Sequence, residues 1–410
     1  MSHSTARMLP LLLVFLAAAC AEAQPARGLN ELGIIAFSAK RYPEALEHFE
    51  KALALDPQNP SLRRNVCRVH QAMANDLTDA GQFEEALARV LLGAEADPEN
   101  PEPKAQAGSY ALRLGRVDEA IGLLDEALSR APDNVEALAL IGEARYQKNN
   151  LNGAREAWEK ALAGRPDWPD LQGKYDKLMR EAPVEAGFAQ YAEGHFQISY
   201  AKALSEETRD LVFSVLEEAW ESVAARLGGL TPPGTVQVVL YDGAQFAEAT
   251  DTAAHVGALY DGKIRAPITD RRGRFLPRRT LSARLTHEFV HVVVVSHLGP
   301  KAPWWLNEGL ADTFSREMDQ SRARLLSRAA HAGALHALRD LESNQLQALE
   351  KDALAVAYAQ AHAAVQRLWD AGGAEKMAAF ISKLKGGAAV EAALRAVYGL
   401  DYAALGEVRL

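Results

Sequence analysis

The amino-acid sequence predicts a mostly α-helical protein with an α+β part. Proline and alanine recur at nearly fixed intervals between residues 25 and 170, which indicates an α-solenoid of stacked helix pairs. Residues 184–410 change to alternating and helical patterns, which predict a small sheet lobe followed by a helical lobe. An HExxH sequence at 287–291 lies in the helical lobe and is the motif with the most specific chemistry.

The first 23 residues are typical of a secretory signal. Arg7 precedes an apolar run that is too short to span a membrane, and small residues follow it. Two processing sites fit this pattern. Cleavage after Ala23 would release a soluble periplasmic protein, whereas a lipobox-like sequence ending at Cys20 would give a lipid anchor there. We therefore expect an exported protein, in the bacterial periplasm or anchored to the membrane as a lipoprotein of the cell envelope.

The overall composition limits the classes of function. The net charge is −9 and the pI is near 5.7, which argues against a general nucleic-acid binder. Cys67 has no obvious disulfide partner, so we expect packing alone to stabilise the fold of this long chain.

Four repeats account for the region after the signal. Their prolines, at positions 57, 98, 132 and 166, are 41, 34 and 34 residues apart, with seven surplus residues before Pro98. Each repeat also has a small residue in its first helix and a large apolar residue in its second. We assign the repeats to residues 29–60, 61–101, 102–135 and 136–169. In all four copies the pattern resembles the tetratricopeptide repeat (TPR).

The repeat array is expected to present a binding groove. One helix pair cannot bury its own apolar face, so stacked pairs form a continuous core with a concave side. We expect a protein partner or a peptide in this groove; the alternative is that the array only spaces or folds the C-terminal region. Residues 171–183 are expected to form a capping helix and a linker, with the domain boundary at Ala182-Pro183.

The C-terminal region, residues 184–410, begins with mixed elements. Alternating and β-rich runs predict strands at 195–200 and 235–241, helical periodicity predicts a helix at 206–227, and Asp261-Gly262 predicts a hairpin turn. From residue 280 onward the chain is predicted to be helical, with loops at 299–300, 372–373 and 386–387.

The HExxH motif predicts a metal centre, the alternative being a chance pattern in a core helix. His287 and His291 are four residues apart, so their imidazoles share one helix face and can bind one zinc ion, while Glu288 reaches its water as general base. Glu308 supplies the third ligand from another helix. Asp312, one turn further, is placed to orient His287. We expect one Zn²⁺ per chain.

These residues are similar to the gluzincin metallopeptidase pattern, HExxH followed by NExxxD, and residues 304–311 resemble bacterial peptidase MA-like domains. The resemblance implies that a strand just before the metal helix forms a sheet edge, which takes an extended substrate as an added strand. It also implies a downstream Tyr or His that stabilises the oxyanion. Tyr358 is our candidate, His362 is the second, and a core role for Tyr358 is the alternative.

The combined patterns predict an exported zinc metallopeptidase whose repeat array binds a protein partner or the substrate. Apart from Asp261, no acidic residue between 256 and 268 is available to hold a free amino terminus, which favours an endopeptidase over an aminopeptidase. Two alternatives remain open. One is an envelope scaffold with a weakly active or inactive peptidase-like domain, and the other is a zinc hydrolase of a non-peptide amide. The sequence gives no indication of the oligomeric state.

Overall fold

The computed structural model describes residues 25–202, 204–250, 258–299, 302–315, 318, 320–343 and 349–407. The predicted signal segment and Cys20 lie outside the described residues, so export and lipidation stay predictions. Within the described part of the chain, no helix is both long enough and apolar enough to cross a membrane.

The chain divides into two compact units. The first extends through Arg113 and also includes Asp118–Ile141 and Ala163–Arg165. The second contains Leu114–Val117, Gly142–Leu162 and Pro166–Leu410. Most of the fourth predicted repeat therefore belongs to the same compact unit as the C-terminal region.

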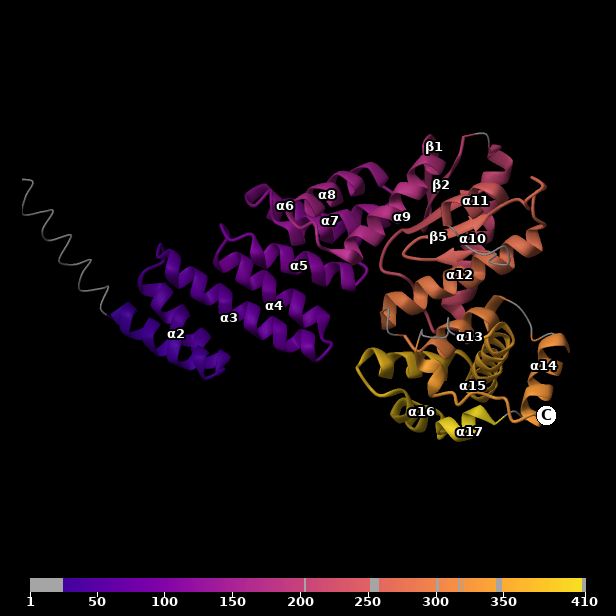
Figure 1. Ribbon diagram of the computed structural model, residues 1–410. Helices are drawn as coiled ribbons and strands as arrows, with labels where there is room; N and C mark the ends of the chain where they lie inside the picture. Colours follow the sequence, from indigo (N-terminus) through magenta and orange to yellow (C-terminus); the bar gives the residue numbers. More distant parts are fainter. Residues whose placement is uncertain are drawn as a thin grey trace, which may run out of the picture. The chain divides into compact units, whose positions relative to one another are not determined.

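Helix pairs form the N-terminal half, as the repeat pattern predicts; they are the indigo to magenta ribbons in Figure 1. Residues 25–38 are helical. The helices that follow are α2 (Tyr42–Leu55), α3 (Pro60–Asp79), α4 (Phe83–Ala96), α5 (Glu102–Arg113), α6 (Val117–Arg130), α7 (Val135–Gln147), α8 (Leu151–Gly164) and α9 (Pro169–Glu185). The surplus residues before Pro98 lengthen α3, which has 20 residues where α5 has 12.

Small residues allow the two helices of a repeat to approach closely. A Cβ atom at Gly33 would lie 2.6 Å from the ring of Phe49, and one at Gly142 would lie 2.3 Å from the ring of Trp158. No side chain larger than hydrogen fits at either position without displacing the aromatic ring. The predicted pairing of a small residue with a large apolar one is confirmed.

The predicted linker at 171–183 is helical. Helix α9 continues through Pro183 and ends at Glu185. A proline cannot donate the backbone hydrogen bond to the residue four positions earlier, and α9 ends two residues after Pro183. The proposed boundary at Ala182-Pro183 therefore falls inside a helix, and the residue limits of the domains stay predictions.

A five-stranded mixed sheet opens the C-terminal region. Its strands are β1 (Phe188–Glu193), β2 (Phe196–Ala201), β3 (Val236–Tyr241), β4 (Leu259–Tyr260) and β5 (Ile264–Pro267), in the order β1-β2-β3-β5-β4. The two outer pairs are antiparallel, whereas β2, β3 and β5 are parallel. Gly262 adopts φ +100° in the predicted hairpin turn. The edge strands are β1 and β4. The expectation that the strand just before the metal helix forms a sheet edge is wrong for β5, because β5 pairs with β3 on one side and with β4 on the other.

Helices complete the C-terminal region. They are α10 (Glu206–Arg226), α11 (Gly243–Thr250), α12 (Arg278–Leu298), α13 (Trp304–Ser315), α14 (Gln320–His331), a 3-10 turn (Asp340–Glu342), α15 (Lys351–Lys385), α16 (Val390–Tyr398) and α17 (Tyr402–Gly406). The predicted break at 372–373 is present, because Gly373 has φ +55° inside α15. The β-branched run that follows His291 is helical and mostly buried in α12, so packing overrides its strand propensity.

Candidate metal centre

The three predicted zinc ligands come together from α12 and α13. Nε2 of His287 lies 3.6 Å from Oε2 of Glu308, and Nε2 of His291 lies 3.7 Å from the same oxygen. Ligand atoms from all three residues lie within 4.8 Å of one another. Tetrahedral zinc bonds of about 2.0–2.1 Å would place ligand atoms roughly 3.4 Å apart. The donor set therefore fits a zinc ion, and three protein ligands leave the fourth position of a tetrahedral site to another group.

Asp312 stands behind His287, as the sequence predicts. Its Oδ1 lies 3.4 Å from Nδ1 of His287, and its side chain is almost fully buried. Although burial opposes the charged ring, Asp312 and Glu308 raise the pKa of His287 to about 9. A carboxylate in this place fixes the orientation of a metal-binding imidazole.

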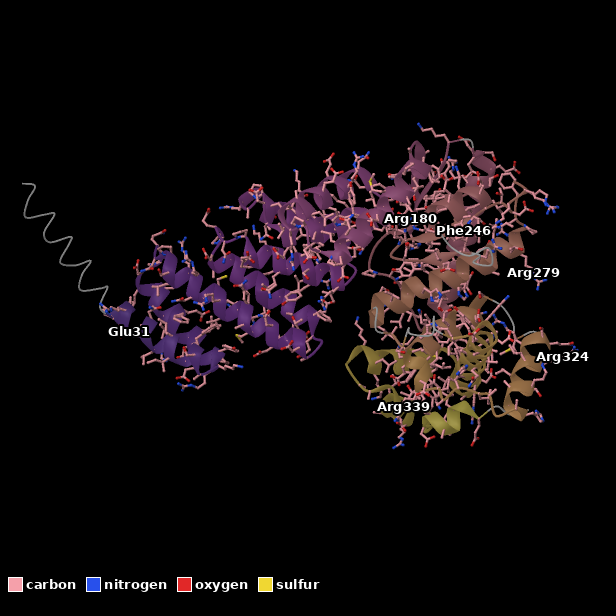
Figure 2. The ribbon with its side chains drawn as sticks, in the orientation of Figure 1. Glu31, Arg180, Phe246, Arg279, Arg324 and Arg339 are labelled. Carbon is pink, nitrogen blue, oxygen red and sulfur yellow. The ribbon has the colours of Figure 1, made fainter. Side chains whose placement is uncertain are left out.

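Two further residues support the ligands, and neither was predicted from the sequence. Oδ1 of Asn307 lies 3.0 Å from Nδ1 of His291, so each ligand imidazole has its own partner on α13. Arg322 of α14 donates a hydrogen bond to Asp312, whereas Arg324 on the same helix is exposed (Figure 2). The only available signal was the position of Asn307 next to Glu308. Arg322 carries no such signal, because its helix has no pattern that points to the site.

Glu288 is buried beside the two ligand histidines on α12. Burial raises the pKa of Glu288, and the charges of His291 and His287 oppose this effect. The pKa of Glu308 is lowered instead, because His291 and His287 outweigh its burial. The two glutamates therefore differ as their predicted roles require: Glu308 stays ionised as a ligand, and Glu288 has a greater affinity for a proton.

The two candidates for oxyanion stabilisation differ in their surroundings. The ring of Tyr358 packs edge-on against Trp304 at a centroid distance of 4.9 Å. Burial raises the pKa of Tyr358, and the negative charges of Glu308, Asp312 and Glu288 raise it further. Tyr358 is thus a protonated donor within the electrostatic field of the site. Nδ1 of His362 instead lies 3.3 Å from Nη1 of Arg322, the residue that donates a hydrogen bond to Asp312.

The fold and this site define a class of protein: helical repeats followed by a domain with a His-His-Glu ligand set. Comparison with protein families identifies both parts. Residues 277–409 match the Peptidase MA superfamily, and residues 26–59 and 111–178 match tetratricopeptide repeat families. The chain therefore carries TPR repeats followed in sequence by a peptidase MA superfamily domain.

Curated relatives include TPR repeat-containing proteins. The TPR repeat-containing protein YpiA of Bacillus subtilis is 25% identical over 199 residues, which cover 48% of this chain and 44% of YpiA. The TPR repeat-containing thioredoxin TTL4 of Arabidopsis thaliana is 29% identical over 102 residues, which cover 25% of this chain and 14% of TTL4. The chain thus spans less than half the length of these relatives.

Solved structures of TPR proteins also resemble part of the chain. YrrB, described as a TPR protein with an unusual peptide-binding site, is 24% identical, covers 37% of this chain and 74% of its own, and has a TM-score of 0.28. The first TPR of Spaghetti (RPAP3), bound to an HSP90 peptide, is 22% identical, covers 28% of this chain and 93% of its own, and has a TM-score of 0.28.

Proposed function

We propose that the protein is an exported zinc-dependent endopeptidase that hydrolyses peptide bonds. The convergence of His287, His291 and Glu308, with Asp312 behind the first imidazole, is the observation that supports this proposal. When bound, zinc would act as a Lewis acid for the scissile carbonyl and would lower the pKa of water.

The protein side chains would carry the proton transfers. Glu288 takes a proton from the attacking water and delivers it to the leaving amine, and its raised pKa suits both steps. Tyr358 donates a hydrogen bond to the developing oxyanion. The outer edge of β4 pairs with an extended substrate, because within the residues that the structure describes β4 is bonded to β5 on one side and to no strand on the other.

The surroundings of Asp261 support an endopeptidase. Its carboxylate forms ion pairs with Lys177 and Arg265. Those two cations occupy Asp261, which is the one acidic residue between positions 258 and 268 that could bind the free amine of a substrate. We further propose that the TPR groove binds a protein partner or presents the substrate, and that export delivers the chain to the periplasm or, through Cys20, to a membrane anchor.

Two variants test the proposed chemistry. Glu288→Gln keeps the shape of the side chain but cannot accept the proton, so it should keep one zinc per chain and lose peptide hydrolysis. Glu308→Ala should lose both. Metal analysis and hydrolysis of an unfolded protein substrate measure these outcomes. Full hydrolysis by Glu288→Gln would refute the mechanism, and a cellular phenotype that this variant restores would favour the alternative, an envelope scaffold with a weakly active domain.

A further inference from the structure

Arg265, on β5, is a fully buried cation that forms hydrogen bonds with residues of three other elements. Its Nη2 donates to Glu181 of α9 at 2.7 Å and to the hydroxyl of Tyr146 of α7 at 2.8 Å. Its Nη1 donates to Glu185 at 2.9 Å and to the hydroxyl of Tyr241 of β3. Every one of these groups is itself buried. Arg265 thus joins the sheet to the fourth repeat and to α9, all within one compact unit.

Lys263 is a second fully buried basic side chain, two residues away on the same hairpin. Its Nζ donates to Oδ1 of Asn149 at 2.7 Å and lies 3.8 Å from the centroid of the Tyr146 ring. Nδ2 of Asn149 in turn donates to Glu185 at 3.1 Å and to Ser199 of β2 at 3.0 Å. Tyr146 and Asn149, both from the fourth repeat, therefore contact the two buried basic side chains of the hairpin.

The hairpin depends on this network because its own strand pairing is short. β4 contains two residues, and among the described parts of the chain it pairs only with β5. Neither β4 residue is fully buried. The turn and β5 contribute Asp261, Lys263 and Arg265, and all three side chains are in the network. The position of the edge strand is therefore set by these charged contacts together with the packing of Leu259 and Tyr260 against buried apolar residues.

Buried ion pairs are a costly way to gain stability, because desolvation offsets most of their attraction. Removing one partner, however, leaves a buried charge without compensation. Such a network therefore fixes the relative positions of the groups that it joins. A network of this kind behind a two-residue strand serves to hold the strand in one position.

We propose that Tyr146 and Asn149 are positioning residues for peptide binding at β4. The fourth repeat would then contribute to substrate binding by holding this strand in place. The inference rests on the proposed peptidase function, since an edge strand must be fixed in place to pair with a substrate. Neither residue contacts the metal ligands, so their loss should weaken substrate binding and leave zinc binding intact.

Tyr146→Phe in the full-length chain tests the proposal, with Tyr110→Phe as the matched control. The hydroxyl of Tyr110 is also buried, but it bonds to Gln106 and Asn75 inside the first unit. We expect Tyr146→Phe to speed hydrogen exchange of the amides in residues 258–267 about tenfold, the loss that one buried hydrogen bond would cause. KM for peptide hydrolysis should rise severalfold, with kcat and zinc content nearly unchanged.

A milder variant keeps the test decisive if Tyr146→Phe does not fold. Lys177→Met removes the ion pairs of Lys177 with Asp261 and Glu181 at the rim of the network, and should shift exchange and KM in the same direction by less. The proposal is overturned if exchange and KM of both folded variants equal those of Tyr110→Phe. If the wild type hydrolyses no peptide but exchange in 258–267 still rises, the proposed function fails while the holding of the strand is upheld.

Discussion

A Cβ atom at Gly309 would lie 2.4 Å from the carbonyl oxygen of Ala361, so α13 rests directly on the backbone of α15. Gly309 follows the ligand Glu308. Any side chain at this position would push the ligand helix away from the two histidines of α12.

Gly309→Ala should therefore destabilise the fold by about 1–3 kcal/mol, as overpacking of a buried contact does. It should also weaken zinc binding, since Glu308 moves with its helix. Denaturant unfolding and zinc titration measure both effects. Gly122→Ala is the control, because a Cβ atom at Gly122 of α6 meets nothing within 4 Å and alanine favours helix by roughly 0.5–1 kcal/mol. Equal effects of the two substitutions would contradict the prediction.

Asn307 should matter for zinc affinity through His291. Asn307→Ala removes the group that faces Nδ1 of His291, so the ring loses its fixed orientation. Loss of such a partner typically weakens metal binding about 10–100-fold. Competition with a fluorescent chelator measures the change in Kd. Asn65→Ala is the control, because Asn65 bonds to Asn30 within the repeats and should leave the Kd unchanged.

Tyr358→Phe separates catalysis from packing. The ring contact with Trp304 remains, and only the hydroxyl is removed. We expect normal zinc content and a fall of kcat by about 10²-fold, the size of effect seen when one oxyanion donor is lost. Steady-state kinetics on a peptide substrate measure this. An unchanged kcat would assign Tyr358 to the core and leave the oxyanion donor to another group.

Lys263 makes stability depend on pH above neutrality. Burial and the charge of Arg265 lower the pKa of Lys263 from 10.5 to about 7, although Glu185, Glu181 and Asp261 oppose the shift. Between pH 7 and 10.5 the unfolded chain binds a proton that the folded chain does not. The free energy of unfolding therefore increases as the pH rises. The Lys263→Met variant lacks this contribution.

Denaturant unfolding of wild type and Lys263→Met across pH 7–10.5 measures the difference. The stability of wild type relative to the variant should increase steadily through this window and stay constant below it. A flat difference across this window would mean that Lys263 stays charged in the folded protein and would contradict the prediction.

The sequence alone was sufficient for the parts of the molecule that follow a local pattern. The helix pairs follow from the recurring proline and alanine, and the ligands His287, His291 and Glu308 follow from fixed spacing on helices. The structure also places the hairpin turn at Gly262, as predicted from the Asp-Gly pair.

The contacts that were missed join residues far apart in the chain. Arg265 and Tyr146 are 119 residues apart, and no periodic pattern relates them. In the sequence, Lys263 and Arg265 alternate with apolar residues, which is also typical of a strand with one solvated face, yet both are fully buried. Strand β1 and helix α11 were not predicted either; the short β1 is half exposed and carries a weak apolar pattern.

The buried side chains of Lys263 and Arg265 limit the positions at which the repeat array can be exchanged, because their partners must be inherited together with the hairpin. A fusion that joins a foreign repeat array at residue 171 would keep most of α9 but would replace Tyr146 and Asn149. The buried side chains of Lys263 and Arg265 would then lose these hydrogen-bond partners. A junction before Gly142, at the border of the compact units, keeps both residues with the hairpin. Related chains should therefore exchange their first three repeats more freely than the fourth.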